Sequence, residues 1–336
     1  MRRVDEVRWG ILGSGAVTEK KSGPALRTTQ GSRLVAVMRR TPGLARDYAE
    51  RHGVPRWYES ADELVADPEV NAVYVATPPG SHAELALLAA RAGKPAYVEK
   101  PMAASYAECR AMIEAFERAG VPLFVAYYRR ALPRFQRVKE LLDAGAIGAP
   151  RTVEIALRRT LRPEELRGEP SWRVMPEIAG GGHFVDLASH TLDLLDWLLG
   201  PIAEARGLAG NQAGRYAAED VVATSLRFES GVLGAGAWTF AAHAPRDRIV
   251  IAGSRGELRF ATFADEPIVL ATERGEESFA IPQPDPIQGP MIARVVAALL
   301  GVDPGGDAGT CDGETAARTT RVMESILGGH APGRQP

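Results

Sequence analysis

A stripe of ionisable side chains runs through an otherwise apolar segment near the middle of the chain. His183, Asp186, His190 and Asp193 follow three consecutive glycines, and on a helix they fall within about 80° of one another. The other positions of 183–199 are mostly Leu, Val, Phe and Trp, which predicts a buried helix whose polar groups need partners. A histidine one turn from a carboxylate can take and return a proton near neutral pH, so we interpret Asp186 and His190 as an acid/base pair.

Two other interpretations of this stripe stay open. One is a core histidine that is satisfied by a structural aspartate. The other is a metal site built from His183, Asp186 and His190. An iron or zinc centre usually has a further defined ligand, so we predict no metal.

A glycine-rich turn near the start of the chain is a candidate phosphate-binding site. Gly13-Ser14-Gly15 follows the apolar run 7–12 and precedes a helical pattern. Glycines let the backbone approach a pyrophosphate, and the helix N-terminus faces its negative charge. The third position of the Gly-x-Gly-x-x-Gly fingerprint is Thr18, neither Gly nor Ala, so an ordinary turn is the alternative. Its place at the first strand-helix junction favours a dinucleotide site.

The end of the second strand indicates which dinucleotide. NAD enzymes usually place an acidic residue there to bind the ribose 2′-hydroxyl. Here the strand ends in Arg39-Arg40, with no Asp or Glu between Gly31 and Asp47. Because a guanidinium binds a 2′-phosphate bidentately and stacks on adenine, we predict NADP(H) in preference to NAD(H). Two solvated surface arginines are the alternative.

Lys100 stands in Glu99-Lys100-Pro101, directly after the predicted strand 95–98. Ligands of open parallel sheets bind at the carboxyl ends of the strands. Lys100 would therefore point at the cofactor, where a lysine can act as a polarising cation or a proton partner. A solvated surface lysine is the alternative. The Lys100–Pro101 bond is a candidate for the cis form.

The elements that must position these residues follow two different patterns of predicted helices and strands, one up to residue 125 and one after it. Up to residue 125, apolar runs at 7–12, 33–38, 72–76, 95–98 and 121–126 alternate with helical patterns at 42–52, 81–92 and 105–119. This alternation predicts a parallel sheet covered by helices. Later come a helix at 132–143, a strand at 151–159, the apolar helix 183–199 and alternating strands over 204–281. Helices at 287–300 and 311–327 flank a Gly/Asp loop at 302–309.

We therefore predict an α/β fold with two domains. A Rossmann domain with a doubly wound parallel sheet occupies 1–127. A second, α+β domain with a large, mostly antiparallel open sheet occupies 128–336 and binds substrate and partner subunits.

Composition excludes several classes of protein. The chain has 336 residues, with 40 basic against 42 acidic side chains, so no basic field is available for nucleic acid or a membrane surface. No apolar run reaches the ~18 residues that span a bilayer, and no signal peptide is recognisable. Cys109 and Cys311 form neither a disulfide framework nor a CxxC metal site. We expect a cytoplasmic protein that binds neither nucleic acid nor membrane.

The ordered set of motifs resembles the Gfo/Idh/MocA family of oxidoreductases, named for glucose-fructose oxidoreductase and inositol dehydrogenase. The resemblance covers nearly the whole chain. Besides the motifs above, it includes the strand-four loop Thr77-Pro78-Pro79-Gly80-Ser81-His82 and the segment Tyr127-Tyr128-Arg129-Arg130. Thr18 and Arg39 depart from the family pattern and bear on the cofactor alone. The arginines are nearer to NADP-using reductases such as anhydrofructose reductase and dimeric dihydrodiol dehydrogenase.

The resemblance implies a nicotinamide cofactor, a small-molecule sugar, cyclitol or related polyol substrate, and a homo-dimer or tetramer built through the C-terminal sheet. It implies a catalytic set of Lys100, Asp186 and His190. By motif match the cofactor-binding residues are Gly13, Ser14, Gly15, Ala16, Val17, Arg39, Arg40, Thr77, Pro78, His82, Glu99 and Lys100. The expected substrate or nicotinamide contacts are Tyr128, Arg129, Trp172, Arg173 and His183.

The expected reaction is reversible hydride transfer between nicotinamide C4 and a carbinol carbon. In the oxidation direction His190 accepts the hydroxyl proton, Lys100 hydrogen-bonds the same oxygen, and Asp186 orients His190 or grips a neighbouring hydroxyl. Two other functions use the same parts. One is a glycosidase that retains NAD and acts by transient oxidation. The other is an NADP sensor without turnover, against which the intact catalytic set counts.

Overall fold

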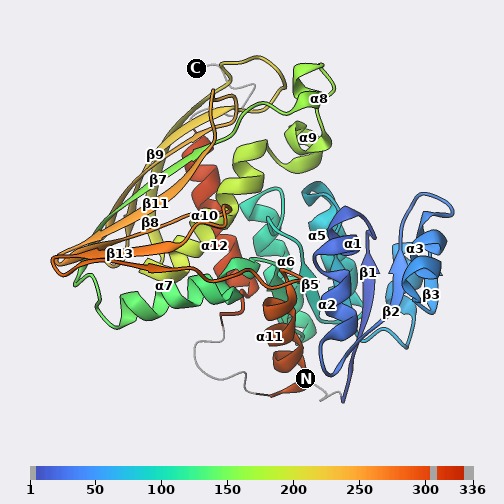
Figure 1. Cartoon of the computed structure of the whole chain (residues 1–336). Coiled ribbons are helices and arrows are strands. Elements are labelled where there is room, and N and C mark those ends of the chain that lie inside the picture. Colours follow the sequence, from blue (N-terminus) through green and yellow to red (C-terminus); the bar gives the residue numbers. More distant parts are fainter. Residues whose placement is uncertain (1–4, 303–308, 329–336) are drawn as a thin grey trace. The chain divides into compact units, whose positions relative to one another are not determined.

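The computed structural model describes residues 5–302 and 309–328 (Figure 1). They divide into two compact units, one comprising 1–132 with 284–317 and the other 133–283 with 318–336. The loop predicted at 302–309 lies almost wholly outside the described residues. No described helix is long and apolar enough to cross a membrane.

The first unit contains the predicted parallel sheet. Its strands lie in the order β3-β2-β1-β4-β5-β6, with every neighbouring pair parallel. This order is that of the doubly wound dinucleotide-binding fold. The strands are β1 (Val7–Leu12), β2 (Ser32–Met38), β3 (Arg56–Tyr58), β4 (Ala72–Val75), β5 (Ala96–Val98) and β6 (Leu123–Val125). The sequence missed β3, because three residues are too few for a periodic pattern.

Helices connect and cover these strands. They are α1 (Ala16–Lys20), α2 (Gly23–Thr28), α3 (Leu44–His52), α4 (Ala61–Ala66), α5 (His82–Arg91) and α6 (Tyr106–Ala119), with single 3-10 turns η1 (Pro79–Ser81) and η2 (Tyr128–Ala131). Local sequence sets the ends of α6. The Ser105 hydroxyl accepts from Glu108 N at 3.2 Å, the Glu108 carboxylate accepts from Ala104 N at 3.0 Å, and Gly120 ends the helix at φ 64°.

The C-terminal part of the chain returns to the first unit, which corrects the single boundary predicted near residue 127. Helix α11 (Gly289–Leu300) packs on α2, β1 and η2. Val125 N donates to Cys311 O at 2.8 Å, next to a bridge between Phe124 and Asp312. The apolar face of α11 is visible in the sequence, but the surface that covers it is not. The division between the units falls within α12 (Gly313–Leu327).

The second unit is built on an eight-stranded sheet in the order β14-β13-β12-β11-β7-β10-β9-β8. The strands are β7 (Pro150–Arg158), β8 (Ile202–Gly210), β9 (Val221–Phe228), β10 (Leu233–Thr239), β11 (Arg246–Gly253), β12 (Gly256–Phe260), β13 (Ile268–Thr272) and β14 (Gly275–Phe279). Only the β7–β10 pair is parallel, so the prediction of a mostly antiparallel sheet is confirmed.

Helices and short turns complete the second unit. They are α7 (Pro133–Asp143), α8 (Pro163–Leu166), η3 (Trp172–Val174), α9 (Pro176–Ala179) and α10 (His183–Leu199). Helix α10 runs along one side of the sheet (Figure 1) and contacts β9, α7 and η3. It begins at the residue that the polar stripe predicted, after Gly182.

Candidate active site

The glycine turn has one packed side and one open side. Gly13 has φ 94°, and a Cβ there would lie 2.5 Å from Thr77 Cγ2, so only glycine fits. The N–H groups of Gly13 and Ser14 both donate to Met38 O, at 3.0 and 3.2 Å. At Gly15 a Cβ would approach nothing nearer than Gly13 O at 3.9 Å. The turn is thus held against β2 and β4 and leaves space at Gly15 for a ligand.

Thr18, which breaks the glycine fingerprint, is accommodated inside the turn. Its hydroxyl donates to Gly15 O at 2.8 Å and accepts from Gly15 N at 3.0 Å. Its carbonyl accepts from the Tyr48 hydroxyl at 3.0 Å. A Cβ on Gly23 would lie 2.1 Å from Thr18 O. The close approach of α2 to α1 therefore requires glycine at position 23.

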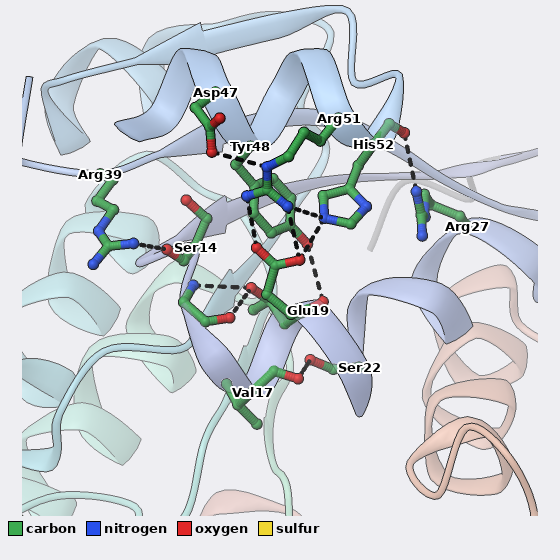
Figure 2. A network of polar contacts seen from close by, with 12 residues as sticks. Ser14, Val17, Glu19, Ser22, Arg27, Arg39, Asp47, Tyr48, Arg51 and His52 are labelled. Atoms are coloured by element: carbon green, nitrogen blue, oxygen red, sulfur yellow. Dashed lines mark hydrogen bonds and ion pairs between the residues drawn. The ribbon is translucent and has the colours of Figure 1, made fainter. Parts of the chain in front are cut away.

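Arg39 lies beside this turn, and its Nη1 donates to Ser14 O at 3.2 Å (Figure 2). Both Arg39 and Arg40 are exposed, and within residues 5–302 and 309–328 neither guanidinium forms an ion pair. The basic end of β2 is thus available to a negatively charged group.

Glu19 on α1 and Asp47 on α3 are already paired with basic side chains (Figure 2). Glu19 accepts from Arg51 Nη2 at 2.8 Å and contacts His52 Nε2 at 2.6 Å, while Arg51 Nε donates to Asp47 at 2.9 Å. The Arg51 hydrogen bonds, together with His52, hold the pKa of Glu19 below its usual value against the opposing effect of burial. This network ties α1 to α3 without using Arg39.

Lys100 lies on the same edge of the parallel sheet as the glycine turn. β1, β4 and β5 are adjacent, so their carboxyl ends place the turn, Thr77 and Lys100 at one edge. The Lys100–Pro101 bond is cis, as anticipated. Lys100 is partly exposed.

Glu99 and His82, two of the expected cofactor-binding residues, form hydrogen bonds within this edge of the sheet. Glu99 is buried and accepts from Tyr74 Oη at 2.6 Å, Gln288 Nε2 at 2.7 Å and Lys100 N at 3.2 Å. His82 has no exposed surface, and its two ring nitrogens face Pro101 O at 2.9 Å and Thr77 O at 2.8 Å. Burial lowers its pKa despite these carbonyls. Both side chains hold loops in place because their polar atoms are occupied by protein.

In the second unit the stripe on α10 divides into exposed and buried members. Asp186 is partly exposed, whereas His183, His190 and Asp193 are buried. Arg173 Nε lies 3.9 Å from Asp186 Oδ2, and the Arg173 guanidinium carbon lies 4.6 Å from the centre of the Trp172 ring. Two predicted contact residues are thereby assembled beside a predicted catalytic carboxylate.

His183, the remaining predicted contact residue on α10, is held by a buried carboxylate. Its Nε2 lies 2.5 Å from Glu165 Oε1, and their side chains are 4% and 1% exposed. The other Glu165 oxygen accepts from Arg162 N at 2.8 Å. The stripe pattern gave the direction of His183 but could not show that α8 covers it. Glu165 carries no motif of its own and lies 18 residues away from its partner.

The remaining predicted contacts belong to η2. Tyr128 and Arg129 are buried, and the Arg129 guanidinium carbon lies 5.4 Å from the centre of the Tyr128 ring. Among the described residues no group of three or more His, Cys, Asp or Glu side chains is arranged to hold a metal ion.

The fold and these sites define an oxidoreductase with an NAD-binding Rossmann domain. The family model for the oxidoreductase family with an NAD-binding Rossmann fold matches residues 7–127, and the model for the GFO/IDH/MocA C-terminal domain matches residues 135–259. The chain belongs to the Gfo/Idh/MocA family.

Individual relatives support this assignment over two thirds of the chain or more. Oxidoreductase P35 of Formosa agariphila is 38% identical over 96% of this chain and 98% of its own. The 1,5-anhydro-D-fructose reductase of Ensifer adhaerens is 33% identical over 67% of each chain. The crystal structure of the WlbA dehydrogenase from Bordetella pertussis with NADH and UDP-GlcNAcA has a TM-score of 0.81 at 27% identity, covering 98% of both chains.

Proposed function

We propose that the chain is an NADP(H)-dependent oxidoreductase that transfers a hydride to or from a carbinol or carbonyl carbon of a sugar, cyclitol or related polyol. The observation that carries the choice of cofactor is Arg39, an exposed guanidinium that donates to Ser14 O in the glycine turn. The relatives named for 1,5-anhydro-D-fructose reduction and crystallised with UDP-GlcNAcA support a sugar-like substrate.

The residues at the carboxyl edge of the parallel sheet fit a dinucleotide. The backbone of Gly13, Ser14, Gly15, Ala16 and Val17 would hold the pyrophosphate, because the space at Gly15 is open. Arg39 and Arg40 would bind the 2′-phosphate, with Thr77 and Pro78 beside the dinucleotide. The bound nicotinamide would supply or accept the hydride.

Lys100, Asp186 and His190 are the proposed proton-handling set. In the oxidation direction His190 takes the hydroxyl proton at an imidazole nitrogen, and the Lys100 ammonium stabilises the negative charge that develops on the same oxygen. Asp186 orients His190 or binds a neighbouring hydroxyl of the substrate. Arg173, which lies beside Asp186, and Trp172, whose ring lies against the Arg173 guanidinium, are proposed substrate contacts together with Tyr128 and Arg129.

Titrations with NADPH and NADH test the cofactor assignment. A charge-assisted hydrogen bond contributes about 1.5–3 kcal/mol, so NADPH is expected to bind roughly 10–150-fold more tightly than NADH. The double variant Arg39→Ser/Arg40→Ser should lose this ratio while its affinity for NADH is retained. Tighter binding of NADH by the wild type would reject the proposal. A cofactor that survives purification would instead favour the NAD-retaining glycosidase.

Turnover of a sugar and polyol panel tests the catalytic set. His190→Ala and Lys100→Ala are each expected to lower kcat by about 10²–10⁴ while NADPH still binds. Near-wild-type turnover in both variants would contradict the assignment. NADPH binding without consumption across a broad carbonyl panel would favour a sensor.

We further propose a homo-oligomer, dimer or tetramer, that forms through the eight-stranded sheet. Leu208 on β8 and Leu233 on β10 are 70% and 56% exposed in the single chain, and large exposed apolar side chains favour association. Leu233→Glu should shift the mass measured by light scattering toward the monomer. A cytoplasmic location is proposed as well, because Cys109 and Cys311 are buried free thiols.

A further inference from the structure

The turn after β12 is held by one carboxylate with three hydrogen bonds. Asp247, on β11, accepts from Thr262 N at 3.0 Å through Oδ1. Its Oδ2 accepts from Phe263 N at 2.5 Å and from Ala264 N at 2.8 Å. Three successive backbone donors bonded to one side chain fix the path of the turn, since each bond to a charged group is stronger than a neutral one.

A cation holds the same turn from its other side. Arg134, on α7, is buried and donates from Nη1 to Ala264 O and from Nη2 to Glu266 O, both at 2.8 Å. The hydroxyls of Thr262 and Thr191 lie 3.2 Å apart, which joins the turn to α10 at the residue after His190. We call Asp247 and Arg134, with the turn 262–266 that they hold, the clamp. Burying a guanidinium is costly, and an ordinary surface turn forms without such a buried cation.

The side chain that the clamp presents is Phe263. Its ring stands edge-to-face with the His190 imidazole, with the ring centres 5.9 Å apart and the planes at 77°. The guanidinium carbon of Arg159 lies 5.5 Å from the centre of the same ring. Phe263 thus contacts both Arg159, the residue after β7, and the proposed catalytic base.

We propose that Phe263 and Asp247 are positioning residues for His190, Phe263 by limiting rotation of the imidazole and Asp247 by holding Phe263 in place. This inference rests on the proposed function, in which His190 takes the substrate proton. A phenyl ring suits the task because it restrains the imidazole through packing and has no proton to exchange. A base must be held in a narrow range of orientations, since a misplacement of about 1 Å can cost roughly 10² in rate.

Histidine NMR of the full-length, NADPH-saturated protein tests the clamp without a substrate. The chain has six histidines, and His190→Gln assigns the signal of His190. Phe263→Leu keeps an apolar side chain and should abolish the ring-current shift of that signal, while Phe263→Tyr should retain it. Asp247→Asn should move the signal in the same direction as Phe263→Leu, because Asn has one acceptor oxygen for the three donors.

Asp220→Asn is the matched control. Asp220 accepts from Gln212 N at 2.8 Å and Ala213 N at 2.7 Å in the same unit, but it holds a different turn. The Asp220→Asn variant should leave the chemical shift of the His190 signal unchanged. An unchanged signal in Phe263→Leu and Asp247→Asn, or an equal change in Asp220→Asn, would overturn the inference and leave the proposed reaction standing.

Kinetics separate positioning from general destabilisation. With the sugar or polyol that the wild type turns over fastest, Phe263→Leu should lower kcat about tenfold or more with little change in KM. Phe263→Tyr should restore most of kcat. Loss of kcat in His190→Ala without loss in Phe263→Leu would refute the role of Phe263 and retain that of His190.

Discussion

Removal of either partner of the buried Glu165–His183 hydrogen bond is expected to destabilise the second unit by about 1–3 kcal/mol. The two side chains are 1% and 4% exposed and their polar atoms lie 2.5 Å apart, so water cannot replace a lost partner. In His183→Leu, Glu165 keeps its bond from Arg162 N at 2.8 Å. In Glu165→Leu, both His183 Nε2 and Arg162 N lose their acceptor. Glu165→Leu should therefore be the more destabilising variant.

Urea unfolding followed by circular dichroism measures the free energy, and thermal unfolding measures the melting temperature. For a unit of 150–250 residues, 1 kcal/mol corresponds to about 2–4 °C, so the melting temperature should fall by roughly 2–12 °C. The control is Glu50→Gln, which breaks the Arg46–Glu50 pair whose side chains are 62% and 65% exposed. It should cost less than about 1 kcal/mol. A loss in Glu165→Leu no larger than in this control would refute the argument that the pair is a buried anchor.

Three further predictions concern other sites. Burial raises the pKa of Glu219, so the folded chain binds this proton more tightly than the unfolded chain. As the pH rises from the ordinary carboxyl pKa through the raised one, wild type should lose stability relative to Glu219→Gln, and the two should converge in acid. Gly13→Ala should weaken NADPH binding at least about tenfold in fluorescence titrations, because the added Cβ would collide with Thr77 Cγ2 at 2.5 Å. Gln288→Leu should cost about 1.5–3 kcal/mol in chemical denaturation, because the buried Glu99 carboxylate loses a donor at 2.7 Å.

Much of the fold was predictable because it depends on short-range patterns. The runs that became β1 and α10 have the predicted ends, since apolar periodicity and flanking glycines act within a few residues. The return of 284–317 to the first unit was not predictable. An apolar helix face indicates that α11 is buried but does not identify the surface that buries it.

The candidate site divides in the same way. The glycine turn and Lys100 were found because each follows a strand in a short motif. Glu165 and Gln288 were missed because they act on partners 18 and 189 residues away. Asp247 and Arg134 carry no motif either, and only the folded sheet brings them to one turn.

The stripe on α10 shows why the helical period of a sequence predicts which way a side chain points but not which groups surround it. A helical repeat fixes the direction of a side chain about the axis, whereas its surroundings change along the axis. His183 and His190 share a direction but stand about 10 Å apart at 1.5 Å per residue. At the start of α10, the short helix α8 places Glu165 against His183, and the two side chains form a hydrogen bond. Near His190, further along α10, the turn after β12 places the Phe263 ring edge-to-face with the imidazole. Two histidines on one face of a helix therefore have different surroundings, because different elements pack against the helix at each position.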